Sequence, residues 1–407
     1  MKLMFLQDFH MDAKGGGTYI LRRLHKYAPE YGVEPFYVYD TNGEGLYESG
    51  EYPSTAFSTR RRQYRFGLGR LAGFATIAGF DSGARKQLQQ IIADEQPDAF
   101  HLTAHGVSFP IMAKAAFETG RPVYLSVHDL WHQTVRPYIP ESLSHGIFGR
   151  IARRAKEIFV VSDEMGEYLR QLYGIQSWKV VHDGVTNIHE RRVVEQMPET
   201  IRLLYVGMVH SRQMKMLHQL VRCLGAFTDR KFEVHFCTRT PYTPEVNPDN
   251  VEIIFHGWLS EEELVALSHN SHMGLLPLSF EPEDALFYRT SFMTKITFYT
   301  SVSLPILCFG PEWASATRIV REDGLGLTFT EHSDEAVTES IRQMLNLTPS
   351  DYQRFIENMK SAAASRFDAA TIAHRFFSSM GLTKGINGHA VPEQAEPSKT
   401  PKQVHEQ

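Results

Sequence analysis

The 407-residue sequence contains few cysteines and no long apolar run. Cys223, Cys237 and Cys308 each stand alone in apolar or helical surroundings, and no C-x-x-C pair occurs. This scarcity argues against a disulfide scaffold and a structural zinc site, and it favours a reducing compartment. No secretory apolar segment opens the sequence, and no apolar stretch approaches the roughly 20 residues of a membrane span. We therefore expect a cytoplasmic protein.

The sequence also has little net charge. Its formal charge is −5 at pH 7, with 42% apolar and 22% charged residues, which is typical of a soluble globular protein. No recognised nucleic-acid-binding motif is present, so we expect no nucleic-acid partner. A chain of this length exceeds one typical hydrophobic core and most naturally forms two domains.

Positive charge is nevertheless concentrated in one segment, "TRRRQYRFGLGRLAGF", which contains Arg60–Arg62 and Arg65 among aromatic residues. Two interpretations stay open. The segment is a solvated charged face, or it is a basic, aromatic patch that rests on an anionic membrane surface or faces a lipid-linked substrate. The second interpretation would make the protein peripheral at the inner face of the membrane.

Short apolar runs alternate with helical patterns along the chain. Near-continuous apolar strands separated by helices predict parallel sheets covered on both faces. Two such series in tandem predict an α/β protein with two doubly wound, Rossmann-like domains, whose ligands bind at the carboxyl ends of the strands. We expect strands at 3–8, 35–40, 99–103, 122–128, 158–162, 179–182, 202–207, 232–238, 251–256, 273–277, 304–309 and 325–329. A polar stretch at 186–200 marks the boundary, and residues 383–407 form a polar tail that we expect to be disordered.

A glycine run, "KGGGTYILRRL", follows the first strand and opens a helix. Glycine is costly to order, so Gly15, Gly16 and Gly17 indicate a sharp turn or a close approach to another group. One interpretation is a flexible turn. The other is a seat for an anionic or hydroxylated ligand at the helix N-terminus.

Polar residues stand at the predicted strand ends of the first half. His101 lies inside a strand and His105 beyond it, and "SVHDLWH" places His128, Asp129 and Trp131 at and after the end of the next strand. His101 has an alternative role as a satisfied core histidine. The aspartate beside His128 suits a polar, oriented imidazole.

The second half supplies cations at equivalent positions. "LLYVGMVHSRQMKML" leaves a strand through Gly207 and enters a helix with Arg212 and Lys215 near its start, where they could clamp a diphosphate or simply form a solvated face. "LLPLSFEPEDALFYRTSFMTKITFY" then contains an acidic loop with Glu281, followed by Ser291, Thr294 and Lys295. Lys295 with its neighbouring hydroxyls could bind phosphate or form a structural ion pair.

The order of these motifs resembles the retaining family-4 glycosyltransferases of the GT-B fold over residues 1–380. "KGGGTYILRRL", "PDAFHLTAHG", "SVHDLWH", "KVVHDGV", "LLYVGMVHSRQMK" and "SFMTKITFYTSVSLPIL" follow one another as the landmarks of that family do. The resemblance implies two Rossmann-like domains facing across a cleft. Residues 1–186 would form the acceptor domain, 200–366 the nucleotide-sugar domain, and a helix at about 367–382 would cross back onto the first domain.

The resemblance also implies roles for the motif residues. His128, Asp129 and Glu281 become the catalytic candidates, and His101, His105 and Trp131 lie on the acceptor side. The candidate donor-binding residues are Gly16, Gly17, Gly207, Arg212, Lys215, Ser291, Thr294 and Lys295. The implied activity is transfer of a sugar from a UDP- or GDP-linked donor to a hydroxyl of a glycan or lipid-linked acceptor, with retention, in polysaccharide or glycoconjugate biosynthesis. No cofactor and no metal are expected, because helix dipoles and basic side chains stabilise the leaving diphosphate in this fold.

Four features depart from the family pattern. Met208 stands where arginine is usual, and the following lysine is displaced by about two positions. Phe298 replaces a glutamate that contacts the nucleotide ribose, and Ser303 replaces a glycine. Two alternatives therefore stay open beside catalysis: a degenerate GT-B subunit that binds a glycan or partner protein, and a GT-B-like sugar-nucleotide epimerase.

Overall fold

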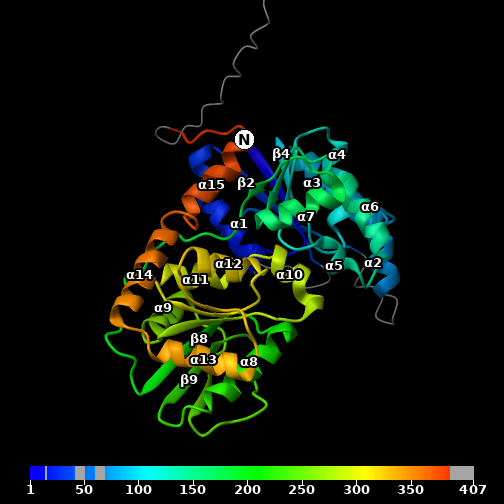
Figure 1. The fold of residues 1–407 in the computed structure, drawn as a ribbon. Helices are drawn as coiled ribbons and strands as arrows, with labels where there is room; N and C mark the ends of the chain where they lie inside the picture. The colour runs from blue at the N-terminus through cyan, green and yellow to red at the C-terminus, as the bar shows by residue number, and fades with distance from the viewer. Residues whose placement is uncertain (14–15, 42–50, 60–68, 386–407) are drawn as a thin grey trace, which may run out of the picture.

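The computed structural model describes residues 1–13, 16–41, 51–59 and 69–385, which form two α/β lobes stacked on one another (Figure 1). Three expectations fall wholly or largely outside these residues: the arrangement of Gly15, the arginine run Arg60–Arg62 with Arg65, and the tail beyond residue 385. Within the described part of the chain, no helix is both long and apolar enough to span a bilayer.

The N-terminal lobe is built on a seven-stranded parallel sheet in the order β3-β2-β1-β4-β5-β6-β7. Its strands are β1 (Lys2–Gln7), β2 (Glu34–Asp40), β3 (Ser54–Phe57), β4 (Ala99–Thr103), β5 (Val123–Val127), β6 (Glu157–Val160) and β7 (Lys179–Val180). The chain winds outward from β1 in one direction and from β4 in the other, so the strand order reverses between these two strands. Ligands of open α/β sheets bind at such a reversal.

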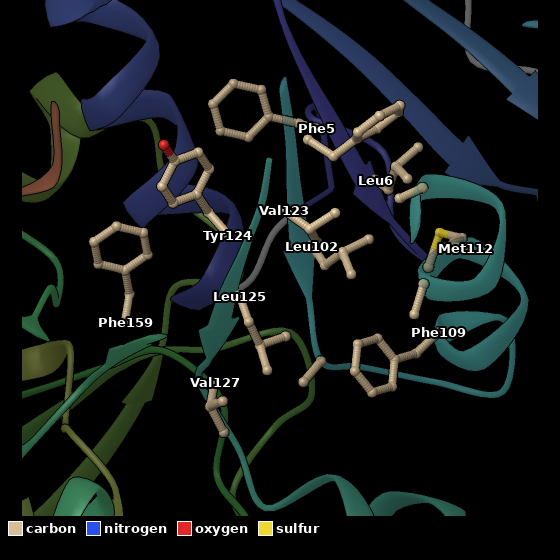
Figure 2. Packing of buried hydrophobic residues seen from close by; sticks show 14 of the residues in the cluster. Phe5, Leu6, Leu102, Phe109, Met112, Val123, Tyr124, Leu125, Val127 and Phe159 are labelled. Carbon is tan, nitrogen blue, oxygen red and sulfur yellow. The ribbon is translucent and has the colours of Figure 1, made fainter. Parts of the chain in front are cut away.

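Helices cover both faces of this sheet. They are α1 (Gly16–Tyr27), η1 (Ala28–Tyr31), α2 (Gly69–Ile77), α3 (Ser82–Glu95), α4 (Phe109–Glu118), α5 (Trp131–Val135), α6 (Glu141–Ala152) and α7 (Asp163–Tyr173). Figure 2 shows why the central strands are apolar throughout: side chains of β4 and β5 such as Leu102 and Leu125 pack toward Phe109 of α4, while Tyr124 and Phe159 lie on the other side. A strand buried on both faces requires a continuous apolar run.

The C-terminal lobe repeats the design with a six-stranded parallel sheet in the order β10-β9-β8-β11-β12-β13. Its strands are β8 (Thr200–Val206), β9 (Lys231–Cys237), β10 (Val251–Phe255), β11 (Met273–Pro277), β12 (Ile306–Phe309) and β13 (Gly326–Phe329). Its helices are α8 (Ser211–Leu224), α9 (Glu261–His269), η3 (Pro282–Asp284), α10 (Ala285–Thr290), α11 (Lys295–Ser301), α12 (Ser315–Glu322), α13 (Asp334–Leu345) and α14 (Pro349–Ala363). The strand order reverses between β8 and β11.

The last helix, α15 (Ala369–Ser378), returns to the N-terminal lobe, where it lies beside α1 (Figure 1). Its Phe376 and Phe377 are buried in the N-terminal core, and Phe377 stacks on Tyr31 with ring centroids 4.8 Å apart. The two chain segments that join the lobes run side by side. Val185 and Asp368 form an isolated parallel β-bridge, and the Val185 amide donates to the Phe367 carbonyl at 2.6 Å.

The predicted fold class is confirmed, because two doubly wound parallel sheets face one another and the terminal helix crosses back. Every predicted strand is present within three residues at each end, whereas β3, α2, α5 and α10 were not expected from the sequence. The exact domain limits stay predictions. The N-terminal sheet ends at Val180 and the C-terminal sheet begins at Thr200.

Candidate functional site

The N-terminal part of the site lies at the strand-order reversal between β1 and β4. Asp8 follows β1 and accepts a 2.7 Å hydrogen bond from Nδ1 of His105, which follows β4. Burial disfavours the charged imidazole, but the hydrogen bond and charge of Asp8, with a further contribution from Asp129, raise the pKa of His105 above its usual value. The pair therefore favours an imidazolium held by a carboxylate.

Two neighbours fix this pair in place. Gly106 has φ +61°, and a Cβ at this position would overlap the Asp8 carboxylate. Glycine is thus required both by the backbone conformation and by the close approach of Asp8. The indole of Trp131 is buried and donates from Nε1 to the Gly106 carbonyl at 2.8 Å. Trp131 therefore joins the loops after β4 and β5 instead of offering its ring to an acceptor.

His128 lies at the end of β5 against the first turn of α1. A Cβ on Gly17 would come within 3.0 Å of Nδ1 of His128, so the glycine run leaves the imidazole room beside the helix N-terminus. Burial, together with the charge of His105, lowers the pKa of His128 to about 4, which makes the ring neutral at pH 7. Its Nε2 is buried and has no hydrogen-bond partner among the described residues. Gly16, the first residue of α1, lies one residue before Gly17 at the same turn.

Asp129 faces the other lobe. Burial raises its pKa, and the charges of His105, His210 and Arg212 oppose that shift. His210 and Arg212 both belong to the C-terminal lobe, so the residues at the end of β5 and at the start of α8 lie within electrostatic reach of one another. The two sets of strand-end residues therefore form opposite walls of one candidate site.

The C-terminal wall is built around the turn after β8. Gly207 has φ +81°, and a Cβ there would lie 3.3 Å from Nζ of Lys295. Lys295 begins α11, and its ammonium lies 4.7 Å from the centroid of the Tyr205 ring and 3.5 Å from the Met208 carbonyl. Burial lowers the pKa of Lys295 to about 8. No carboxylate forms an ion pair with Lys295 among the described residues.

Arg212 and Lys215 both begin α8 but lie in different environments. Nε of Arg212 donates to Oδ1 of Asp284 at 2.7 Å, and the guanidinium covers the Phe287 ring at 4.4 Å. Lys215 is 77% exposed and pairs with Glu281 on the surface of the lobe. Arg212 thus lies within electrostatic reach of Asp129, whereas Lys215 and Glu281 form an ion pair at the surface of the lobe.

Gln213 occupies the position at which the family motif has a lysine. It is buried between Tyr205, whose hydroxyl donates to Oε1 at 2.7 Å, and the Pro277 carbonyl, to which Nε2 donates at 3.2 Å. A polar but uncharged side chain therefore stands where a cation is expected. Lys295, above the same tyrosine ring, is the nearby cation.

The remaining predicted residues of the C-terminal lobe are mainly structural in this state. The buried Ser291 ends α10, and its carbonyl accepts a hydrogen bond from the Ser315 hydroxyl. Thr294 precedes Lys295 as the N-cap of α11. Phe298 is half-buried in the core of the lobe, and the buried Ser303 has φ +50°. That left-handed conformation is the physical reason why glycine is usual at the position of Ser303.

His101 lies in the core, not at the acceptor wall. It is fully buried, its Nε2 forms a 2.7 Å hydrogen bond with the Ser126 hydroxyl, and the rings of Phe5 and Phe376 pack against it. Burial, with a smaller effect of His128, lowers its pKa to about 3. This placement favours the alternative of a core histidine, with Nε2 paired and the buried Nδ1 without a hydrogen-bond partner among the described residues.

Sequence reasoning did not single out Asp8 or His210 as site residues. Asp8 is the first residue after β1, so its strand-end position was the available indication. His210 gave no such indication, since it caps α8 in a capping box with Gln213.

Polar side chains link the two lobes near the β-bridge between the crossing segments. The buried Asp183 accepts a 2.7 Å hydrogen bond from the hydroxyl of Thr297 in α11, and Nε of Arg23 in α1 lies 3.8 Å from its other oxygen. A second hydrogen bond also joins the lobes: the Ser162 hydroxyl donates to the Thr290 carbonyl at 2.6 Å. These contacts hold the lobes in one relative arrangement.

Two facing Rossmann-like lobes with a crossing helix define the GT-B fold. Residues 14–186 match the model of Glycosyltransferase Family 4, so the N-terminal lobe carries the likeness to that family. A search of curated proteins found no match. Solved structures support the fold over the whole chain. A glycosyltransferase from Rickettsia africae ESF-5 has 14% identity and a TM-score of 0.63, with 93% of this chain and 97% of that chain covered.

Two further solved structures contain uridine nucleotides. The MnaA–UDP structure from S. aureus has 14% identity and a TM-score of 0.54, and the match covers 93% of this chain and 95% of the MnaA chain. The E. coli structure titled trehalose-6-phosphate, bound with UDP-2-fluoro glucose, has 10% identity and a TM-score of 0.60, with coverages of 93% and 99%. At such identities these similarities establish the GT-B fold of this chain.

Proposed function

We propose that this protein is a glycosyltransferase that moves a sugar from a nucleotide-sugar donor to a hydroxyl acceptor with retention of the anomeric configuration. The acceptor would be a glycan or a lipid-linked glycan. UDP-linked donors are favoured, because solved structures of two proteins of the same fold contain UDP and UDP-2-fluoro glucose. The family match on residues 14–186 supports the reaction class.

The observation that carries the proposal is the ammonium of Lys295. It lies next to the Gly207 turn, its pKa is lowered to about 8 by burial, and no described carboxylate pairs with it. A partly buried cation without a carboxylate partner is a favourable place for an anion to bind. The diphosphate of the donor supplies that anion, and Arg212 at the start of α8 would contact it from the other side.

The transfer would need no metal and would use residues of both walls. As the sugar leaves the diphosphate, Lys295, Arg212 and the α8 N-terminus stabilise the growing negative charge. His128, neutral at pH 7, offers Nε2 to the transferred sugar as a hydrogen-bonding group, because a ring with a pKa of about 4 is a weak base. Asp129 and the Asp8–His105 pair would orient the acceptor hydroxyl.

The second candidate is a degenerate subunit that binds a glycan or a partner protein without catalysis. It is motivated by Met208, Phe298 and Ser303, which stand where the family has an arginine, a glutamate and a glycine. This candidate predicts that no nucleotide sugar binds. The epimerase alternative predicts instead that a donor is altered without any acceptor.

Calorimetric titration of the full chain with UDP, GDP and their sugars separates these candidates. We expect UDP to bind and Lys295→Met to weaken binding about 10- to 100-fold, the effect of losing one charge-assisted contact of about 1.5–3 kcal/mol. Lys360→Met is a matched control, since Lys360 pairs with Glu190 on the surface. Absence of binding by every nucleotide sugar would instead support the degenerate subunit.

We also propose a peripheral contact with an anionic membrane at the cytoplasmic side. The arginine run at 60–65 precedes α2, whose Leu71 is 64% exposed, and Phe80 beyond α2 is 74% exposed. A run of cations that is followed in the sequence by exposed apolar side chains suits an anionic lipid surface. Flotation with anionic vesicles should show binding that weakens with salt, and equal flotation after replacement of Arg60–Arg62 by glutamine would contradict the proposal.

A further inference from the structure

Three side chains that can bind a metal come together on α5 and α6, the two helices that follow His128 and Asp129 in the chain. His132 lies on α5, and Glu141 and His145 lie one turn apart on α6. One ligand atom of each comes within 4.8 Å of the others, and no second group of three histidine, cysteine or acidic residues does so in the part of the chain that the structure describes. We propose that His132, Glu141 and His145 bind one zinc-class divalent ion that fastens α5 to α6.

The separation of the ligand atoms fits the ion. Nε2 of His145 lies 3.4 Å from Oε1 of Glu141. Zinc binds histidine and carboxylate ligands at 2.0–2.2 Å in a tetrahedron, which places neighbouring ligand atoms about 3.3–3.5 Å apart. The ligand atom of His132 lies within 4.8 Å of the other two, so a small approach of this side chain completes the set. Two imidazoles and one carboxylate favour zinc over magnesium, which prefers oxygen ligands.

The surroundings already orient one ligand. Nδ1 of His145 forms a 2.6 Å hydrogen bond with the Tyr173 hydroxyl. In the tautomer in which Nδ1–H is the donor, the lone pair of Nε2 points to Glu141 and is available to a metal. Such outer hydrogen bonds fix the tautomer and direction of histidine ligands in metal sites. His132 is 6% exposed, while Glu141 is exposed, so the site has one buried ligand and one entry side.

The ion would act as a positioning device. His132 lies three residues after Asp129 and four after His128. A link through the ion from His132 to α6 would therefore fix the C-terminal end of the loop that holds both residues in the candidate site. The ion itself would contact neither the donor nor the acceptor. The scarcity of cysteine does not bear on this site, because none of its ligands is a thiolate.

Zinc binding by the full chain tests the inference. Protein treated with EDTA, desalted and mixed with zinc chloride should retain one zinc per chain after gel filtration and melt about 2–5 °C higher. Glu141→Gln and His145→Gln should each lower zinc affinity at least about 100-fold, and Tyr173→Phe about 10- to 100-fold. Glu141 is exposed, so its variant should fold normally even if a change of His132 does not.

A matched control and a second ion complete the experiment. His218 lies 3.8 Å from Glu245 in a histidine–glutamate pair without a third ligand, so His218→Gln should leave zinc binding unchanged. Magnesium chloride should give no shift in melting temperature. Equal zinc binding by the wild type and by the Glu141 and His145 variants, or no stoichiometric zinc at all, would overturn the inference. The inference does not rest on the proposed activity, since zinc binding is measured without a sugar donor.

Discussion

The clearest consequence of the site is that nucleotide binding should weaken as the pH rises through 8. Burial lowers the pKa of Lys295 to about 8, so its charged form prevails below that pH and is lost above it. An anionic diphosphate binds the charged form. The sign is therefore fixed: affinity is highest at neutral pH and falls in mildly alkaline solution.

The size of the effect follows from the protonated fraction of Lys295 in the free protein. With a pKa of about 8, roughly nine tenths of the chains carry the ammonium at pH 7 and roughly one tenth at pH 9. If the neutral form binds about 10- to 100-fold more weakly, as expected for Lys295→Met, the Kd for UDP should rise about five- to ninefold. The terminal phosphate of UDP has a pKa near 6 and is almost fully ionised across this range. Arg212 stays charged, and the lowered pKa of His210 keeps its ring neutral.

Isothermal titration calorimetry of UDP between pH 7 and pH 9 at constant ionic strength measures this profile. Lys295→Met should bind UDP weakly and with nearly constant affinity over the same range. Lys295→Arg, which keeps a charge at all these pH values, should bind more tightly than the methionine variant and remove the alkaline loss. A flat wild-type profile, or the same slope in the methionine variant, would refute the assignment of the diphosphate to Lys295.

Three further predictions concern the N-terminal wall and the joint between the lobes. His128→Ala should lower sugar transfer at least 100-fold while the Kd for UDP changes less than twofold, and wild-type turnover would exclude the role given to His128. Gly106→Ala should lower the free energy of unfolding by about 2–5 kcal/mol in urea, because its positive φ and the nearby Asp8 carboxylate both resist a Cβ; a loss below about 0.5 kcal/mol would contradict that account. Asp183→Ala, which removes one acceptor of the Thr297 hydroxyl and the side-chain acceptor of the Gly184 amide, should cost about 2–4 kcal/mol in the same measurement, with Asp229→Ala on the surface as the neutral comparison.

The sequence predicted the strands well because the architecture forces a simple pattern on them. A run such as Leu3–Leu6 is fully buried, and parallel strands covered on both faces must be apolar at successive positions. β3, with the sequence STAF, lies at the edge of its sheet and is only partly buried, so it carries no such pattern. The five-residue α5 and six-residue α10 are too short to show helical periodicity.

The strand-end rule placed His105, His128 and Asp129 at one edge of the sheet, but it could not give their partners. Asp8 and His105 are 97 residues apart, and they meet only because β1 and β4 are neighbours. Likewise, the pairing of Lys215 with Glu281 depends on the distance between α8 and the loop after β11. The sequence identifies residues with suitable side-chain chemistry, whereas the packing of the helices and strands decides which of them form hydrogen bonds or ion pairs with one another.

The bridge between Val185 and Asp368 gives the C-terminal lobe a particular topology. The lobe leaves and re-enters the N-terminal lobe at neighbouring points, so it is in effect a domain inserted into its partner, with adjoining ends. Domains whose two chain ends lie close together can fold as units and are tolerated as insertions in other domains. The C-terminal lobe of such a chain can therefore be replaced as a single unit, while the N-terminal lobe, closed by α15, keeps its own core.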